Sequence, residues 1–469
     1  MRDRRGLEVH GAAAAIDAYD RALDHLLRFQ VEMVPAGIEA VSADPGFALG
    51  HVFNCYIALL STDATATAEA RERFLDARFD EAALDGRERG HVAIARRWLD
   101  GDLLGASEAL ASLTIEHPRD LLALAVGHQI DFFTGNAPSL RDRIGRALDA
   151  WHPDDPDHGF LLGMYAFGLE ETNLYGRSED LGLRAAAANV DDVWAIHAVV
   201  HTFEMQSRIP EGITFMRARE ASWAEGNFLS VHNAWHYALF ALQGGEVAPA
   251  LEIYDQVLHP EGAEDIPLHL LDASSLLWRL HLDGLPTGDR WSSLADAWAR
   301  CLTPGRSPFN DLHAAMAYVG AGKQDALDEL LDELARVAAH PSATDTGALL
   351  TSSVGLAVCR ALRAYGDARY ELVVTELLAV RRSLHTIGGS HAQRDVVERT
   401  LLLCAVEAGD HALAGALLSE RLARNEASTW SWLAKARARH AAGDEGEAAA
   451  SQQRSHELSM PIREALVAS

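Results

Sequence analysis

The residues with the clearest potential for chemistry are two pairs of histidines, each with the spacing HxxxH. The stretch WAIHAVVHTFEMQSR (194–208) contains His197 and His201, and Glu204 follows three residues later. The stretch VHNAWHYALF (231–240) repeats the spacing with His232 and His236. Residues four apart lie on one face of a helix, so each pair can present two imidazoles together. Such imidazoles can chelate a divalent metal ion or act as acid–base groups.

The elements that must position these histidines are the helices of a repeat. Glycines recur between apolar-periodic segments, and 34 residues separate Gly101 from Gly135 and Gly409 from Gly443. A glycine of this kind ends one helix of a hairpin. The next residue is suited to capping the second helix of the hairpin. These expected caps are Asp102, Asn136, Asp367, Asp410 and Asp444.

The same frame continues with Asn173, Ser207 and Gly245 at the turn. A period of 34 to 38 residues with a turn between two helices is typical of tetratricopeptide repeats. The sequence therefore predicts an all-α fold, a tetratricopeptide-like α-solenoid of about eleven helical hairpins forming a single domain over residues 1–469. An open solenoid and a closed superhelix or toroid are both compatible with the pattern.

The repeat frame places the candidate residues on one surface. With the turn residue as position 15, the inner-face positions 2, 5, 9 and 12 of three successive first helices are occupied by imidazoles and carboxylates. Neighbouring helices pack about 8 to 10 Å apart, so we expect these side chains to converge. They are Glu170, His197, His201, Glu204, His232 and His236.

Each of these residues has a predicted role. The predicted catalytic residues are His201, His236 and Glu204. The predicted ligand-binding residues are Glu170, His197, His232 and Arg394. The predicted metal ligands are His197, His201, His232 and His236. A metal site, a metal-free pocket and a purely structural hydrogen-bonded cluster are the three alternatives.

Arg394 belongs to the stretch GGSHAQRDVVERTLL (388–402), in which two glycines and a serine precede a helix start. Helix N-termini favour anions, so Arg394 could hold a substrate carboxylate there. The stretch can also be a simple loop between repeats, and this interpretation is favoured. Trp235 is expected to pack between hairpins and to point away from the candidate site. His91, His128 and Asp131 could continue the lining of the inner surface, but they are interpreted as ordinary packing positions.

Composition limits the function classes. The chain has 469 residues, 48% of them hydrophobic, and a formal charge of −27. The acidic surface predicts that nucleic acid is not a partner. The four cysteines form no CxxC and no run of 18 apolar residues occurs, so we expect neither a thiolate site, nor a signal peptide, nor a membrane partner, and place the protein in the cytoplasm.

Several segments of the chain resemble one known family. HAVVHTFEMQ, VHNAWHYALFALQGGEVAPALEIYD, SSLLWRLHLDG, RWSSLADAW and DLHAAMAYVGAG follow one another over about residues 160 to 322. In sequence and order they look like the tetratricopeptide repeat protein 38 family. The resemblance implies a closed or tightly wound helical-repeat fold in the cytoplasm and implies no particular reaction. The sequence departs from the family pattern at LEETNLY, where Glu171 stands beside Glu170.

Two function classes follow. The favoured one is a His- and Glu-lined inner pocket that binds a polar small molecule or a peptide end in the concave groove, with acid–base or metal-assisted chemistry. The alternative is a non-catalytic tetratricopeptide scaffold for protein–protein interaction. A divalent metal is the only cofactor that the residues suggest. Catalysis and homo-oligomer formation are left open.

Overall fold

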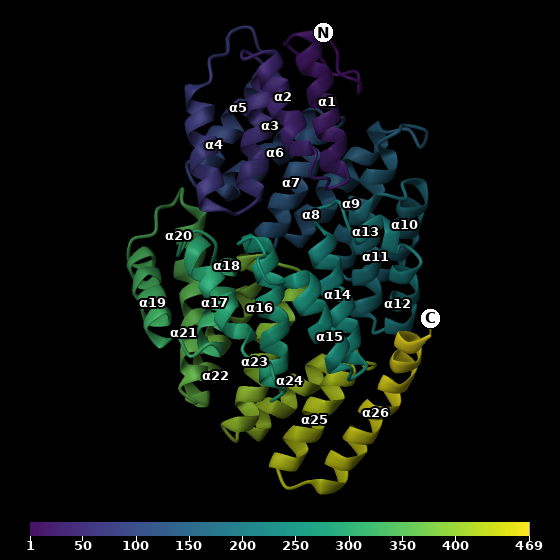
Figure 1. Ribbon diagram of the computed structural model, residues 1–469, viewed down its shortest axis with the longest axis vertical. Helices are drawn as coiled ribbons and strands as arrows, with labels where there is room; N and C mark the ends of the chain where they lie inside the picture. The colour runs from purple at the N-terminus through teal and green to yellow at the C-terminus, as the bar shows by residue number, and fades with distance from the viewer. Residues whose placement is uncertain (469) are drawn as a thin grey trace. The chain divides into compact units, whose positions relative to one another are not determined.

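The computed structural model describes residues 1–468, and its regular secondary structure there is helical (Figure 1). Two isolated β-bridges, Arg2 with Glu8 and Gln30 with Asn227, are the other backbone pairings. Leaving aside the short helices α13 (Glu220–Trp223) and α20 (Thr346–Leu350), the helices of the described chain form twelve successive pairs. The all-α, tetratricopeptide-like helical-repeat fold predicted from the sequence is thus confirmed.

The chain divides into two compact units. The first consists of residues 1–199, 221–230 and 341–349, and the second of residues 200–220, 231–340 and 350–469. Within each unit, consecutive helices pack as hairpins, such as α9 on α10 and α25 on α26. The prediction of a single domain stays a prediction.

The first unit contains ten complete long helices and the start of α11 (Val193–Met205). They are α1 (Ala13–Leu27), α2 (Met33–Ala43), α3 (Ala48–Leu60), α4 (Ala64–Asp76), α5 (Gly86–Leu99), α6 (Leu103–Glu116), α7 (Leu121–Phe133), α8 (Ala137–Ala147), α9 (His158–Glu171) and α10 (Tyr175–Ala188).

The second unit contains the end of α11 and the remaining long helices. These are α12 (Ile209–Arg217), α14 (Ser230–Gln243), α15 (Val247–Ile253), α16 (Pro267–Leu282), α17 (Arg290–Cys301), α18 (Pro308–Gly320), α19 (Gln324–Ala339), α21 (Leu356–Gly366), α22 (Tyr370–Val380), α23 (His391–Glu407), α24 (His411–Arg424), α25 (Thr429–Ala441) and α26 (Glu445–Val467).

The predicted turns have the backbone conformation that hairpins need. Gly101, Gly135, Gly409 and Gly443 all have a positive φ, between 62° and 94°. The left-handed region costs glycine little, which explains its choice. Asn173 and Ser207, which replace glycine in the frame, adopt the same region with φ of 62° and 53°. The repeat frame read from the sequence therefore fixes where helices end.

The predicted N-caps are confirmed at four of the five positions. The side chains of Asp102, Asn136, Asp410 and Asp444 each accept a hydrogen bond from a backbone N–H in the first turn of the following helix. The prediction for Asp367 is wrong. Ala368 takes the left-handed turn position (φ 54°), so α22 starts after Arg369 and Asp367 stands before the turn.

Candidate functional site

Two helices of the second unit bring three histidines together. His201 comes from α11, and His232 and His236 come from successive turns of α14. The ring centroids of His201 and His236 are 4.4 Å apart, and those of His232 and His236 are 4.8 Å apart. One ring nitrogen of each histidine lies within 4.8 Å of the others. We call these three residues the histidine cluster.

Carboxylates hold two of the three rings. The Nδ1 of His236 is 2.6 Å from an oxygen of Glu204, and the Nδ1 of His232 is 2.9 and 3.0 Å from the two oxygens of Asp272 on α16. A carboxylate accepts, so the imidazole donates from Nδ1 and carries its proton there. The lone pair of each ring is then on Nε2.

Burial determines the protonation of the cluster. His201 and His236 are completely buried. Burial first, and then the neighbouring positively charged groups, lower the pKa of both histidines well below its usual value. Burial also raises the pKa of Glu204 to about 7, against the opposing charge of Arg279. At neutral pH the two buried imidazoles are therefore neutral.

Trp235 lies against the cluster, so the prediction that it points away is wrong. Its indole stacks on His232 with centroids 5.2 Å apart and lies 4.8 Å from His236. Trp235 follows His232 by three residues, and a side chain as wide as indole reaches back over this angle. On the other side, the guanidinium carbon of Arg279 on α16 is 5.3 Å from the indole ring.

Several polar atoms beside the cluster lack a hydrogen-bond partner within residues 1–468. They are Nδ2 and Oδ1 of Asn233, Nε1 of Trp235 and Nε of Arg279. Asn233 and Trp235 are completely buried and Arg279 is 2% exposed. The remaining nitrogens of Arg279 are bonded, Nη2 to the carbonyl of Ala392 at 2.7 Å. A buried donor without an acceptor is costly and rare, so such atoms indicate a missing partner.

The start of α23 is organised by a capping box. The Ser390 hydroxyl accepts from the backbone of Gln393, whose side chain accepts from the backbone of Ser390. Arg394 donates to the carbonyl of Gly389. The charge of Arg394 contributes to the lowered pKa of His201, so the residue lies within electrostatic reach of the cluster. Its predicted role in holding a ligand carboxylate stays a prediction.

The two remaining predicted residues belong to the first unit. Glu170, in the last turn of α9, is completely buried, and His197 is 1% exposed. The ring of His197 packs 5.1 Å from Phe167 and 4.9 Å from Trp194. His197 precedes His201 by one turn on the same helix. The predicted roles of Glu170 and His197 stay predictions.

Sequence reasoning missed Asp272, Asn233 and Arg279. The repeat frame places Asp272 next to an inner-face position, because Gly284 has the positive φ of a turn residue (69°). Counted from that turn, Asp272 takes position 3 of its first helix, close to the position that His232 occupies in the preceding repeat. Asn233 lies between two histidines, and no spacing rule distinguishes it from a packing residue.

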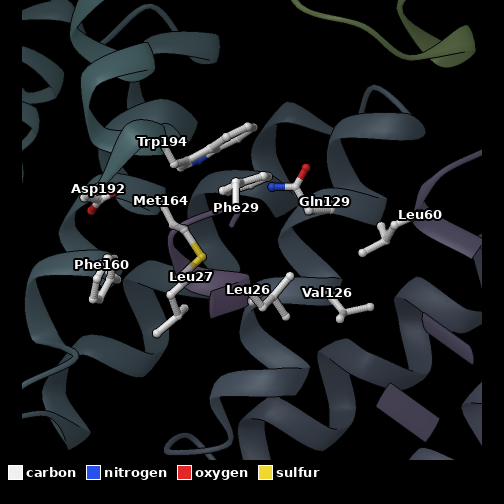
Figure 2. A pocket seen from close by; sticks show the side chains of 11 residues that line it. Leu26, Leu27, Phe29, Leu60, Val126, Gln129, Phe160, Met164, Asp192 and Trp194 are labelled. Carbon is white, nitrogen blue, oxygen red and sulfur yellow. The ribbon is translucent and has the colours of Figure 1, made fainter. Parts of the chain in front are cut away.

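A separate pocket lies in the first unit (Figure 2). Its walls are mostly apolar and include Leu26, Leu27, Val126 and Trp194, with Asp192 at one edge. About 20 Å³ is free for the centre of a water-sized molecule, which is room for one or two waters. No residue predicted as a site residue lines it, and its size argues against a larger ligand.

Fold and cluster together define a tetratricopeptide-like helical-repeat protein with a buried histidine–carboxylate cluster. A scan against known protein families finds no match for the chain. Among solved structures, an IFIT1 monomeric mutant with Gppp-AAAA is 14% identical over 98% of both chains, with a TM-score of 0.40. A human IFIT1 dimer with PPP-AAAA is 12% identical over 98% of both chains, with a TM-score of 0.38.

A third structure, the tetratricopeptide domain of P58(IPK), is 13% identical over 81% of this chain and 96% of its own, with a TM-score of 0.22. The exclusion of nucleic acid by charge is overturned by the two IFIT1 structures, each of which holds an oligonucleotide. Net charge is a sum over the whole surface, whereas binding depends on a local patch. Separately, no helix within residues 1–468 is long and apolar enough to cross a bilayer.

Proposed function

We propose that the second unit contains an enclosed binding site for a polar small molecule or a peptide end, centred on the histidine cluster. The observation that carries the proposal is the set of buried hydrogen-bonding atoms without a partner beside the cluster, on Asn233, Trp235 and Arg279. The indole of Trp235 connects these atoms with the cluster, since it stacks on His232 and lies 5.3 Å from the guanidinium carbon of Arg279.

The chemistry of these atoms indicates what the ligand must offer. Trp235 Nε1 and Arg279 Nε can only donate, so the ligand needs acceptor oxygens or nitrogens. Asn233 can both donate and accept, which suits an amide or a hydroxyl group. A wholly apolar ligand would leave all of these atoms unsatisfied. The predicted proton-transfer roles of His201, His236 and Glu204 belong to the same site.

Removal of a single N–H tests the proposal. Trp235→Phe keeps an aromatic ring and deletes Nε1. Trp298→Phe is the matched control, because Trp298 is equally buried but its Nε1 donates to Ser274 at 2.9 Å. Both variants lose the same ring atoms from a buried position and so the same kind of packing. Trp298→Phe also loses a hydrogen bond, so we expect it to destabilise the free protein by about 1 kcal/mol more than Trp235→Phe does.

Ligands are identified by thermal shift with a panel of polar metabolites, short peptides and PPP-AAAA. A ligand of the wild type should bind Trp235→Phe about tenfold more weakly, as measured by calorimetry. Trp298→Phe should bind it normally. Equal affinity of the wild type and Trp235→Phe for every ligand found, or a loss of stability in Trp235→Phe as large as in the control, would contradict the proposal.

Membership of the tetratricopeptide repeat protein 38 family is also proposed. The segments HAVVHTFEMQ and VHNAWHYALF, which suggest it, coincide with α11 and α14 and supply the whole histidine cluster. An alignment of that family tests the relation. Residues equivalent to His201, His232 and His236 should be histidine in its members, and free variation at these positions would count against it.

A further inference from the structure

The histidine cluster has the composition of a metal centre. Its three imidazoles come from two helices of one unit, and a ring nitrogen of each lies within 4.8 Å of the others. Nitrogens bound to one zinc ion are each about 2.0 to 2.1 Å from it. Two nitrogens bound to one ion are therefore at most about 4.2 Å apart, so the three rings must turn toward one another for all of them to bind it. His232 and His236 also have the one-turn spacing of a helical chelate.

The groups behind the imidazoles match those behind metal ligands. A histidine that binds a metal usually donates its other ring N–H to a carboxylate or a carbonyl, which fixes the tautomer and makes the ligand more basic. His232 does this with Asp272 and His236 does it with Glu204. Both bonds involve Nδ1, so an ion would bind these two rings through Nε2. The cluster thus contains two imidazoles that each donate Nδ1–H to a carboxylate, the arrangement expected of metal-binding histidines.

The local charge balance is suited to a divalent cation. The two carboxylates, Glu204 and Asp272, supply up to two negative charges next to the neutral rings. A buried cation needs such compensation. Arg279 is a buried cation near both carboxylates. Burial lowers the pKa of Arg279, and the charges of Glu204 and Asp272 partly oppose this shift. Arg279 is also close to Asp395, which is ion-paired with Arg399 at 2.6 Å and with Arg421 at 2.7 Å.

We infer that His201, His232 and His236 bind one borderline divalent transition-metal ion, of which zinc is the type, with Asp272 and Glu204 orienting two of the ligands. Imidazole ligands suit zinc, copper, nickel or iron(II), whereas magnesium and calcium require oxygen ligands. Three protein ligands are the number found in catalytic zinc sites, which keep a further position for water or substrate. The open position serves the polar ligand of the function proposed above, on which this inference rests. In that case His201 and His236 are ligands of the ion and not acid–base groups.

The test uses the full chain purified without a histidine tag. Elemental analysis of the wild type should find about one transition-metal ion per chain, as a three-histidine site predicts. After chelation, titration with Zn²⁺ should restore that stoichiometry. Co²⁺ in the same site should give the visible absorption of a low-coordinate ion. Absence of a bound ion combined with no saturable Zn²⁺ or Co²⁺ binding overturns the inference.

Variants assign the binding to the cluster. Asp272→Asn keeps all three ligands and should weaken Zn²⁺ about 10- to 100-fold, the usual effect of losing such a partner. His236→Ala removes a ligand and should weaken Zn²⁺ further. His281→Ala is the matched control, since His281 is a partly buried histidine of α16 that packs on Trp278. Binding that is equal in Asp272→Asn, His236→Ala and the control overturns the inference even where all three variants fold.

Failure of the metal centre can be distinguished from failure of the proposed function. A chain that binds polar ligands in a Trp235-dependent way but holds no ion refutes the metal centre and leaves the binding site. A chain that holds one ion through the cluster but binds no polar ligand supports the metal centre and refutes the binding site. Elemental analysis and calorimetry on the same sample separate the two results.

Discussion

Arg143 in the first unit and His236 in the second are both almost completely buried, yet their surroundings differ. Arg143 makes two bonds of 2.8 and 2.9 Å to the carboxylate of Asp131 and a third of 3.1 Å to the hydroxyl of Ser107. One positive charge thus faces one negative charge. His236 has one carboxylate on one side and imidazoles of His201 and His232 on the other.

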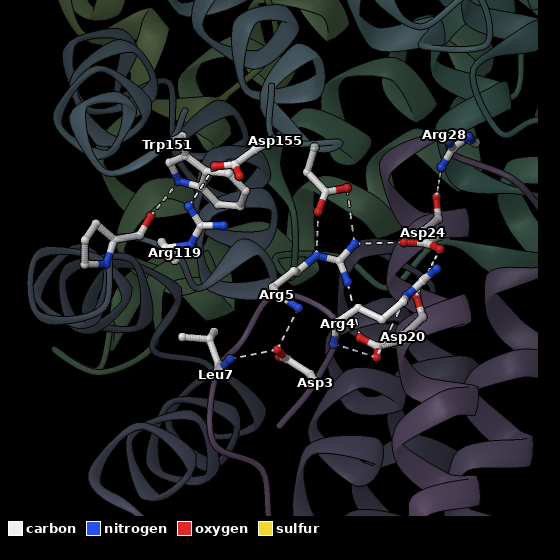
Figure 3. Close-up of polar contacts among 12 residues, drawn as sticks. Asp3, Arg4, Arg5, Leu7, Asp20, Asp24, Arg28, Arg119, Trp151 and Asp155 are labelled. Atoms are coloured by element: carbon white, nitrogen blue, oxygen red, sulfur yellow. Dashed lines mark hydrogen bonds and ion pairs between the residues drawn. The ribbon is translucent and has the colours of Figure 1, made fainter. Parts of the chain in front are cut away.

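The N-terminal segment of the first unit also brings opposite charges together, here one guanidinium and three carboxylates (Figure 3). Arg5, whose side chain is 4% exposed, lies within ion-pair distance of Asp20, Asp24 and Asp157. It joins the start of the chain to α1 and to the residue before α9. Oppositely charged groups that satisfy each other fix segments in place. In the histidine cluster, by contrast, three imidazoles converge, and carboxylates bind two of them.

The largest effect should follow from breaking the paired arrangement. Asp131→Asn leaves the guanidinium of Arg143 buried without its counter-charge. We expect a loss of about 3 to 5 kcal/mol in the free energy of unfolding, the usual cost of removing one partner of a buried ion pair. Urea unfolding measures it. A loss below about 1 kcal/mol would mean that the pair is not a major contributor to the fold.

Metal removal should have the next largest effect, and it should act on the second unit. For a ligand present at a hundred times its Kd, binding to the folded state adds about 2.7 kcal/mol to stability. We expect chelation to remove this increment from the wild type and from Asp131→Asn alike, because distant sites are additive. His236→Ala should show no increment. Chemical unfolding with Zn²⁺ and with chelator measures the difference, and an increment retained in His236→Ala would contradict the assignment.

The fold was predictable because each turn of the repeat is encoded by a few neighbouring residues. A left-handed turn residue followed by a capping side chain is a signal within a few residues, and it held at Gly101, Gly135, Gly409 and Gly443. It failed at Asp367, where Ala368 takes the left-handed position although it is not glycine. The packing of the two helices decides which of two neighbouring residues takes the left-handed turn position. The local sequence does not contain this information.

The site was predictable only in part. HxxxH spacing fixes which imidazoles share a helix face, and the repeat frame brought α11 and α14 together. The partners of these rings depend on a third helix, since Asp272 and Arg279 come from α16. The orientation of Trp235 depends on how far a wide side chain bends over the helix surface, which spacing does not determine. Position along a frame predicts proximity but not hydrogen bonding.

Asp192 is an exception to the pairing in the first unit and gives a pH-dependent effect. Its side chain accepts from the backbone N–H of Ala195 at 2.9 Å and is 1% exposed. Burial first, and then the charge of Asp191, raise its pKa to about 8, although the backbone hydrogen bond and Arg28 oppose the shift. The folded state therefore keeps a proton that the unfolded state releases above about pH 4.

Stability should accordingly fall as pH rises from about 4 to about 8, by up to about 1.4 kcal/mol per pH unit from this group. Asp192→Asn retains an oxygen that can accept from Ala195 and cannot ionise. We expect its unfolding free energy to lack this part of the pH dependence and to equal or exceed that of the wild type at pH 8. Parallel curves for the two proteins would show that Asp192 is ionised in the folded state.

The smallest effect should come from an ion pair that shares the charges of Arg143 and Asp131 but not their burial. Glu69 and Arg73 on α4 are 2.7 Å apart, with side chains 55% and 71% exposed. Water and salt screen such a pair, and one-turn pairs on helices contribute about 0.3 to 0.5 kcal/mol. We expect Glu69→Gln to lower the unfolding free energy by no more than this, and by less at high salt. A loss approaching that of Asp131→Asn would show that charge itself, and not its desolvation, makes buried pairs important in this protein.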